Sequence, residues 1–364
     1  MARRSATSTA TSLEPPNRRS DRFLEGLRDA SSVIFVSHVH PDPDSLGSML
    51  GLSHLVQTVL KKPTRLSRDG EISRAENRAM VDLLDIPLTS LDQLNLCAEG
   101  TKIVMVDSQP NTGRHNFNCS RAPLFAVIDH HDTPGDLANV PFIDIRPDAG
   151  ATCSIVVQYL LEQKCSIPPC LATALLYGIE TELCGFPREA TAMDDAALHV
   201  LYPLADKDLL SRIRNARLPQ SYFGCLVQAL QSSFIYDRLI VSWINDLPQP
   251  ELAAEVADFL MRFEEVDWAV VAGVYEGRLI LSARSSAPDA KAGEVLQRVV
   301  GNRGKAGGHD RRAGGVVFLH NTSHRTIEEV RSELRRRLLH ALNIEECRGQ
   351  RLVSKREMLH NLTA

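Results

Sequence analysis

The segment HVHPDPDSLGSMLGL, at residues 38–52, places two histidines and two aspartates directly before an apolar run that is typical of a helix. Imidazoles and carboxylates together suit Mn²⁺ or a similar divalent ion. The same residue types also occur in a polar turn that caps a helix, and here Asp44 or Ser45 would be the cap. The segment alone allows both interpretations, so residues elsewhere in the chain have to decide between them.

Two further apolar runs end in the same kinds of side chain. They are TKIVMVDS at residues 101–108, with Asp107, and LFAVIDHH at 124–131, with Asp129, His130 and His131. These runs, like the one before His38, are continuous and not alternating, which is typical of strands buried on both faces of a parallel sheet. Functional groups of open α/β sheets gather beyond the carboxyl ends of the strands, so we expect the three endings to meet.

We expect an acidic side chain near residue 180 to lie with these three strand endings as well. Carboxylates crowded at one sheet edge repel each other unless a cation lies among them. A pair of divalent ions that share one carboxylate is a common device for displacement at phosphorus. The residue types therefore indicate a divalent-metal site with phosphoryl chemistry.

Helical patterns lie between and after the predicted strands, at residues 44–60, 152–163 and 170–183. This alternation indicates an α/β domain over about residues 22–200. A helical, charged stretch follows, and then a second α/β unit with a hairpin predicted to turn at Glu276 and Gly277.

Length, composition and charge limit the classes of protein to which the chain can belong. The 364 residues suggest roughly two domains, and the net charge of −4 gives no strong field for duplex DNA. No apolar run is long enough to span a membrane, and the eight cysteines include no C-x-x-C pair. We therefore expect a cytoplasmic protein with reduced thiols and no membrane partner.

Taken in the order in which they occur along the chain, these motifs resemble those of the DHH phosphoesterase superfamily. They read HVHPDPDSLGS (38–48), Asp107, DHH (129–131) and GIETE (178–182), and GGH (307–309) is similar to the signature of the DHH-associated C-terminal domain. The resemblance implies an α/β fold: an N-terminal DHH domain with a mostly parallel sheet flanked by helices, plus a smaller C-terminal α/β substrate-binding domain. The short architecture is most similar to the nanoRNase and pAp-phosphatase branch, because the RecJ relatives carry additional domains.

The expected organisation has five parts: a disordered tail (1–21), the DHH catalytic domain (22–203), a helical connector (204–233), the DHH-associated domain (234–343) and a basic C-terminal tail (344–364). The resemblance implies two divalent ions, with Mn²⁺ expected and Mg²⁺ or Co²⁺ as alternatives. One would be held by His38, Asp42, Asp107 and Glu182, and the other by Asp44, Asp107 and His130.

The resemblance also implies roles for the remaining motif residues. Asp129 would orient the histidine pair, and His131 would face the scissile phosphate. The predicted substrate-binding residues are Arg284, Gly307, Gly308, His309 and Arg312. The two glycines and the amides after them can form a backbone nest for a phosphate.

Three positions depart from the family pattern. Pro43 replaces a glycine and stiffens the loop. Glu182 replaces an aspartate and reaches one methylene further, and Arg312 replaces an alanine. His40 stands where the family has asparagine, so we do not count it as a ligand.

The expected function is therefore hydrolysis of phosphoester bonds in short single-stranded oligonucleotides or small nucleotides, by a water activated between two metal ions. The alternatives are a catalytically weakened, nucleotide-binding regulatory protein and a RecJ-like single-strand exonuclease. A homodimer is compatible with the sequence.

Overall fold

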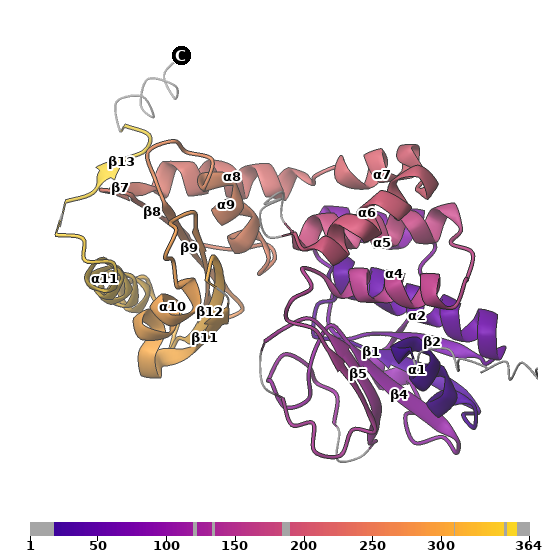
Figure 1. The fold of residues 1–364 in the computed structure, drawn as a ribbon. Coiled ribbons are helices and arrows are strands. Elements are labelled where there is room, and N and C mark those ends of the chain that lie inside the picture. The colour runs from indigo at the N-terminus through magenta and orange to yellow at the C-terminus, as the bar shows by residue number, and fades with distance from the viewer. Residues whose placement is uncertain are drawn as a thin grey trace, which may run out of the picture. The chain divides into compact units, whose positions relative to one another are not determined.

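The structure is a computed structural model that describes residues 18–118, 122–132, 135–183, 190–308, 310–345 and 348–354. The chain forms two compact units, Met1–Ala216 and Arg217–Ala364, and each is considered by itself (Figure 1). The division falls inside the predicted connector, and the domain boundaries given above remain predictions. Helix α1 (Arg19–Leu27) begins within the predicted disordered tail, because Ser20 Oγ donates to Glu162 at 2.5 Å and Phe23 is buried.

The N-terminal unit contains the predicted parallel sheet, with described strands in the order β3-β2-β1-β4-β5-β6. Its strands are β1 (Ser32–Val36), β2 (Thr64–Arg68), β3 (Leu88–Ser90), β4 (Thr101–Val106), β5 (Leu124–Asp129) and β6 (Phe142–Ile145). Its other helices are α2 (Pro43–Leu60), α3 (Ala75–Leu83), η1 (Leu91–Gln93), α4 (Thr152–Glu162), α5 (Pro169–Glu182), α6 (Ala192–Leu204) and α7 (Lys207–Arg214). Neighbouring strands pair in parallel throughout.

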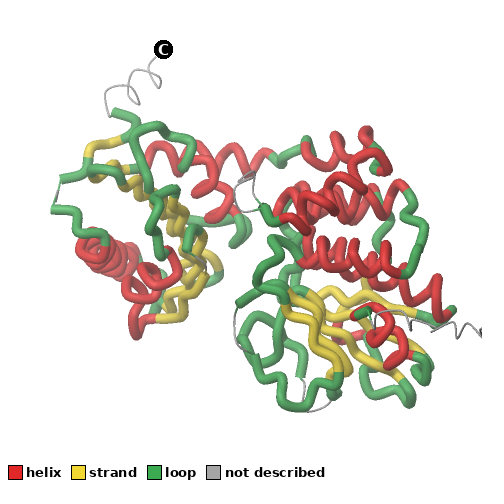
Figure 2. The backbone as a smooth tube through the Cα atoms, in the orientation of Figure 1, coloured by secondary structure: helices red, strands yellow, loops and turns green. Residues whose placement is uncertain are grey.

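Both faces of this sheet are covered, which explains why its strands read as continuous apolar runs. Phe35 and Val104 belong to the core beneath α2, α4 and α5. Ile34 and Met105 face the other way and belong to a second buried cluster with Phe117. Loops, green in Figure 2, lie beside the yellow strands of this sheet. The apolar runs therefore report burial on both faces.

The C-terminal unit has a mixed sheet in the order β11-β12-β10-β9-β8-β7-β13. The strands are β7 (Phe234–Tyr236), β8 (Leu239–Ile244), β9 (Trp268–Tyr275), β10 (Arg278–Ser285), β11 (Gly304–Gly308), β12 (Arg312–Phe318) and β13 (Gln350–Arg351). The helices are α8 (Gln220–Ser232), α9 (Leu252–Leu260), α10 (Ala292–Val300), η3 (Gly301–Arg303) and α11 (His324–Ala341). Only β8 and β9 pair in parallel; the other described pairs are antiparallel.

Details of this unit confirm one prediction and correct two. The β9–β10 hairpin turns at Glu276 and Gly277, which have φ values of 44° and 75°. The stretch predicted as a nest-forming loop contains β11, because Gly304–Gly308 pairs with β12 in a regular antiparallel ladder. Residues Gln350–Arg351 of the predicted tail pair with β7, so this part of the tail belongs to the sheet.

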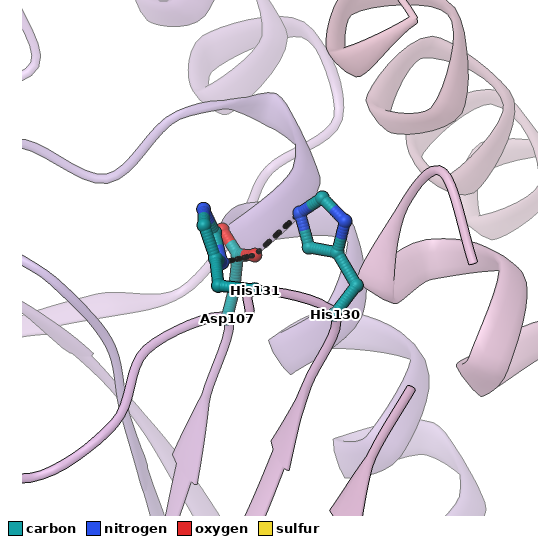
Figure 3. Close-up of side chains that lie close together, drawn as sticks. All are labelled: Asp107, His130 and His131. Atoms are coloured by element: carbon teal, nitrogen blue, oxygen red, sulfur yellow. Dashed lines mark ion pairs between the residues drawn. The ribbon is translucent and has the colours of Figure 1, made fainter. Parts of the chain in front are cut away.

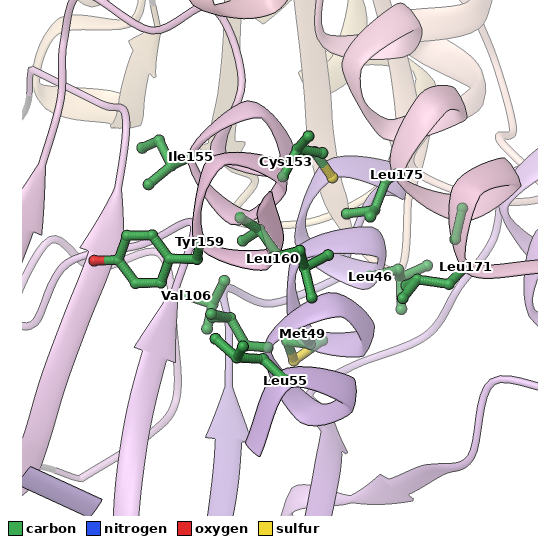
Figure 4. Packing of buried hydrophobic residues seen from close by; sticks show 14 of the residues in the cluster. Leu46, Met49, Leu55, Val106, Cys153, Ile155, Tyr159, Leu160, Leu171 and Leu175 are labelled. Atoms are coloured by element: carbon green, nitrogen blue, oxygen red, sulfur yellow. The ribbon is translucent and has the colours of Figure 1, made fainter. Parts of the chain in front are cut away.

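The core of the N-terminal unit depends on a close crossing of α2 and α5 (Figure 4). A Cβ added at Gly178 of α5 would lie 2.6 Å from Cys153 Sγ and 2.8 Å from the Pro43 carbonyl oxygen. One added at Gly47 of α2 would lie 2.9 Å from the Ala174 carbonyl oxygen. These two glycines therefore let the start of α2 lie directly against α5, directly after residues 38–42, which we call the metal loop.

In the part of the chain that the structure describes, no helix is long and apolar enough to cross a membrane.

We expect Gly178→Ala to lower the free energy of unfolding by about 1–3 kcal/mol, because the new methyl group overlaps backbone atoms that cannot move freely. Gly224→Ala is the matched control: it lies within α8, and an added Cβ would meet nothing within 4 Å. That substitution should be neutral or stabilising by up to about 1 kcal/mol. Chemical denaturation of both variants checks this, and equal effects would contradict the close-crossing argument.

Candidate metal centre

Asp107 lies at the centre of the predicted site, one residue beyond β4. Its backbone has a φ of 55°, and its amide donates to the Ile128 carbonyl at 2.9 Å. Oδ2 is 3.5 Å from His38 Nε2, and Oδ1 is 3.6 Å from His130 Nε2. Figure 3 shows this carboxylate between the rings of His130 and His131. The three strand endings therefore converge on one carboxylate, as the sequence predicts.

The rings of His38 and His130 are held in the same way. Nδ1 of His38 is 2.9 Å from the Val39 carbonyl oxygen, and Nδ1 of His130 is 3.2 Å from that of Ala149. A carbonyl can only accept, so Nδ1 carries a hydrogen and each neutral ring keeps a lone pair on Nε2. Both Nε2 atoms are buried with no hydrogen-bond partner among the described residues. Two such nitrogens beside a shared carboxylate fit a bound divalent cation.

Asp42 links the metal loop to α2. Its Oδ2 is 3.5 Å from His38 Nε2, and its Oδ1 accepts the Ser45 amide at 3.0 Å as the helix cap. The cap is therefore Asp42, and not Asp44 or Ser45 as the sequence suggested, because Pro43 already occupies the first turn. One side chain thus fixes the start of the helix and faces the predicted site.

Asp44 is anchored by the first turn of α4. Its Oδ2 accepts the Thr152 amide at 2.8 Å, and its Oδ1 accepts the Cys153 amide at 2.7 Å. The first amides of a helix lack partners within the helix and carry its positive end, so they stabilise a carboxylate. His130 Nε2 lies 4.0 Å from Oδ2. The Asp44 side chain is therefore fixed next to His130 by backbone groups far away in the sequence.

Two groups of three described side chains bring ligand atoms within 4.8 Å of one another. They are His38, Asp42 and Asp107, and Asp107, His130 and His131. Asp107 is common to both, as the two-ion prediction requires. The second group contains His131 where we predicted Asp44, and Glu182 belongs to neither group. The ligand roles remain predictions.

Asp129 is fully buried and orients His131. Its Oδ1 is 2.8 Å from His131 Nδ1 and also accepts the His130 amide at 2.8 Å. Burial by itself raises the pKa of this carboxyl, but the hydrogen bonds from His131 and Gln109, together with the charges of the two histidines, outweigh burial and lower the pKa below its ordinary value. An ionised Asp129 thus holds the hydrogen of His131 on Nδ1.

Gln109 is a site residue that the sequence reasoning missed. Its Nε2 donates to Asp129 Oδ2 and to the His131 carbonyl, both at 2.9 Å, and its Oε1 accepts the Gly135 amide at 3.0 Å. Its side chain is buried. It therefore joins the segment after β4 to the DHH turn. The available signal was its position two residues after Asp107, at a buried strand ending.

Thr152 was missed as well, and it holds the central carboxylate directly. Its Oγ1 donates to Asp107 Oδ1 at 2.9 Å, and its amide donates to Asp44 Oδ2 at 2.8 Å. The sequence predicted only that a helix begins here. One residue at the start of α4 therefore contacts two predicted ligands.

The electrostatics of the site reflect crowding of negative charge. Burial, and then the charge of Asp107, raises the pKa of Asp44 well above its ordinary value. Burial lowers the pKa of His130, but Asp107, Asp44 and Glu182 together raise it to about 9. The pKa of His38 shifts in the same direction because Asp42 and Asp107 outweigh its burial. A proton and a metal ion compete for the same imidazole lone pair, so these shifts mark where a cation is favoured.

Glu182 and His40 lie at the margin of this arrangement. Glu182 is the last residue of α5, and its charge contributes to the raised pKa values of Asp44 and His130. His40 Nδ1 is 3.2 Å from the Glu71 amide, and His40 belongs to neither ligand group.

The described substrate residues predicted in the C-terminal unit lie on three neighbouring strands, β10, β12 and β11. Arg284 of β10 is directly opposite Arg312 of β12, and Gly307 of β11 is opposite Gly314. Opposite residues of antiparallel strands share a face, so the two arginines and two glycines lie on the same side. Arg284 is engaged there by Asp258 and by Ser282 Oγ at 2.9 Å. His309 lies outside the described residues.

This face is open beside the glycines. A Cβ added at Gly307 would meet nothing within 4 Å, and one at Gly314 would meet only the Leu281 carbonyl oxygen at 4.0 Å. The described backbone is thus open at the two glycines, and Arg284 and Arg312 are neighbouring residues on the same face. Such a surface suits a phosphate beside a planar group.

Comparison with known proteins gives three findings. Residues 32–179 match the family described as "DHH family, N-terminal domain". The chain is 26% identical over 309 residues to the cyclic-di-AMP phosphodiesterase GdpP of Bacillus subtilis, covering 80% of this chain and 45% of that protein. It is 26% identical over 162 residues to the bifunctional oligoribonuclease and PAP phosphatase NrnA of Mycoplasma genitalium, covering 44% and 48%.

A solved structure matches the fold over most of the chain. It is an exopolyphosphatase-related protein from Bacteroides fragilis, with a TM-score of 0.70 and 16% identity, covering 92% of this chain and 100% of that one. This likeness shows the fold alone. The chain spans about half the length of the curated relatives it matches.

We expect Mn²⁺ to raise the thermal unfolding midpoint of the wild-type chain. At a hundredfold excess over the dissociation constant, binding contributes about 2.7 kcal/mol to stability. Asp107→Asn should remove this shift, because it removes the shared carboxylate charge. It should change metal-free stability less than it changes the Mn²⁺ shift, because the Asp107 charge repels Asp44 but attracts the imidazoles of His38 and His130. Thermal scans with Mn²⁺ and with EDTA provide the measurement, and an equal Mn²⁺ shift in both proteins would contradict the metal centre.

Proposed function

Because residues 32–179 of this chain form a DHH-family N-terminal domain, we propose that the protein is a metal-dependent phosphoesterase acting on short oligonucleotides or small nucleotides. The observation that carries this proposal is the position of Asp107 between the imidazoles of His38 and His130, whose Nε2 atoms are buried. Each ring has its Nδ1 against a carbonyl and its Nε2 without a hydrogen-bond partner among the described residues.

The residues present fit two divalent ions. His38, Asp42 and Asp107 would hold one, and Asp107 and His130 would hold the other, with Asp44 and Glu182 close by. Mixed imidazole and carboxylate ligands favour Mn²⁺, with Mg²⁺ or Co²⁺ as alternatives. Bound ions of this kind supply polarisation of a phosphoryl oxygen and a lowered pKa of water.

The chain itself supplies orientation and proton handling. Asp129 fixes His131 through Nδ1, so Nε2 is the atom through which this ring would contact a phosphate oxygen. With its hydrogen on Nδ1 directed at Asp129, the His131 ring keeps a fixed orientation toward the predicted substrate position. Gln109 and the His130 amide hold Asp129 in turn.

The choice of substrate class rests on the C-terminal unit and on the relatives. Arg284 and Arg312, next to an open glycine surface, suit a phosphate attached to a planar base. Among the relatives, GdpP bears the name of a cyclic-di-AMP phosphodiesterase and NrnA that of an oligoribonuclease and PAP phosphatase. All of these substrates are nucleotides with phosphoester bonds, so we propose the same class for this chain.

A substrate panel tests the proposal. We expect Mn²⁺-dependent hydrolysis of at least one among dinucleotides, pAp and cyclic di-AMP, with rates measured by chromatography. Asp107→Asn should lower kcat by roughly a thousandfold, because it disturbs both ligand groups at once. The matched control is Asp267→Asn, a partly exposed, ion-paired carboxylate of the C-terminal unit, which should keep wild-type rates.

The outcomes separate the alternatives. Rates that increase with strand length would favour the RecJ-like exonuclease over the nanoRNase-like enzyme. Tight nucleotide binding without turnover in Mn²⁺, Mg²⁺ and Co²⁺ would indicate the weakened regulatory protein. Glu182, which replaces the family's aspartate, would then be the first position to change back. Activity that survives chelation would contradict the metal mechanism.

Gln109→Ala should lower kcat by roughly 10–100-fold with a smaller effect on KM, because Asp129 and His131 lose their support. The control is Gln158→Ala, a part-buried glutamine of α4 that hydrogen-bonds Arg146 and Glu162. Both variants lose a structural glutamine, so they should lose similar stability. Equal loss of kcat in both would show that the effect is structural only.

A further inference from the structure

A cavity of about 560 Å³ lies at the β8–β7–β13 edge of the C-terminal unit. Its walls include Phe234, Trp243, Arg331, Ser332, Arg335 and Arg351. We call it the arginine pocket. The glycine surface of β11 and β12 lies at the opposite edge of the same sheet, so the two features are separate.

The pocket concentrates positive charge. Its lining residues include three arginines and one carboxylate, Glu328, which gives 3 − 1 = +2 in a chain whose net charge is −4. Glu328 is already engaged with Arg331 Nη1 at 2.9 Å. Guanidinium groups gathered without matching carboxylates favour an anionic ligand, above all one with phosphate oxygens.

Arg331 is built into the wall and keeps hydrogen-bonding capacity. Its side chain is only 11% exposed, and Nη2 donates to the Ile244 carbonyl and to Asn245 Oδ1, both at 3.1 Å. Its Nε is buried without a hydrogen-bond partner among the described residues. Buried donors are rarely left unsatisfied, so this atom indicates that a further acceptor belongs in the pocket.

Two guanidinium groups also lie over aromatic rings. The Arg331 guanidinium carbon is 5.8 Å from the ring centre of Trp243, and that of Arg351 is 4.7 Å from the ring centre of Phe234. Such pairs hold the guanidinium plane in a fixed orientation. Aromatic rings and arginine planes are the surfaces on which unpaired bases stack.

We propose that the arginine pocket binds single-stranded nucleic acid, with phosphates on Arg335 and Arg351 and an adjacent base against the aromatic–arginine pairs. Amide and hydroxyl groups from Gln228 and Ser332 line the same cavity and can contact base edges. An acidic peptide would match the charge but would leave the aromatic–arginine pairs without a planar partner. The site goes beyond the proposed hydrolysis, because it predicts an oligonucleotide-binding surface in the C-terminal unit that does not require turnover.

The test uses the full chain in EDTA, so that binding is measured without hydrolysis. Fluorescence anisotropy follows a labelled RNA strand of about twelve nucleotides. Arg335→Gln combined with Arg351→Gln should weaken binding roughly tenfold. The same double substitution should make log K less dependent on log salt, with a slope smaller by about 0.7 for each phosphate that no longer pairs with an arginine.

Arg336→Gln is the matched control for the first substitution. It removes the same charge from the next residue of α11, which does not line the pocket. Its binding should stay within about twofold of the wild type. A double variant that binds as tightly as Arg336→Gln would overturn the proposal. Thermal midpoints near that of the wild type in both proteins confirm that they fold.

Two further measurements separate base recognition from plain charge. The chain has two tryptophans, so Trp268→Phe leaves Trp243 as the reporter, and the RNA strand should quench its fluorescence. Inorganic polyphosphate of equal charge should compete at least tenfold more weakly than the strand. Equal competition without quenching would show an anion site that does not recognise bases and would contradict the proposed ligand. Failure of hydrolysis in the substrate panel would leave this binding result unaffected.

Discussion

The dominant constraint on the N-terminal unit is the repulsion among carboxylates that the parallel sheet brings together around Asp107. A buried carboxylate is costly unless it is paired or accepts hydrogen bonds, and here several lie beside one another. The raised pKa of Asp44 and the raised pKa of about 9 for His130 both express this cost. Divalent cations are the natural complement, because they neutralise the shared charge and accept the imidazole lone pairs.

Much of the surrounding structure serves to hold these charges in place. The first amides of α4 fix Asp44, the Thr152 hydroxyl fixes Asp107, and Gln109 fixes Asp129. The close crossing of α2 and α5 at Gly178 places the metal loop against a packed core that resists displacement. Ligand positions set by backbone amides and packed helices are already arranged before a cation binds, which reduces the ordering cost of binding.

The C-terminal unit has arginines at both edges of its sheet. On the β10–β12 pair, Arg284 and Arg312 border open glycines, a geometry that admits a flat group close to the backbone. At the other edge of the sheet, aromatic rings hold the guanidinium groups of Arg331 and Arg351 in orientation. A chain with a net negative charge thus has two local groups of arginines, and composition alone does not reveal them.

The sequence by itself determined the parallel sheet and the identity of most side chains at the predicted centre. Continuous apolar runs that end in Asp or His indicate both the buried strands and the side chains at their ends. A short segment is enough for this, because burial on both faces and the position of a strand end are properties of the segment itself. Tertiary structure decided what those segments meet. Asp42 rather than Asp44 caps α2, Gly304–Gly308 forms a strand rather than a loop, and Gln109 and Thr152 support the ligands through contacts between distant segments. Such contacts depend on how helices and strands pack in three dimensions, and no periodicity or spacing within one segment encodes them.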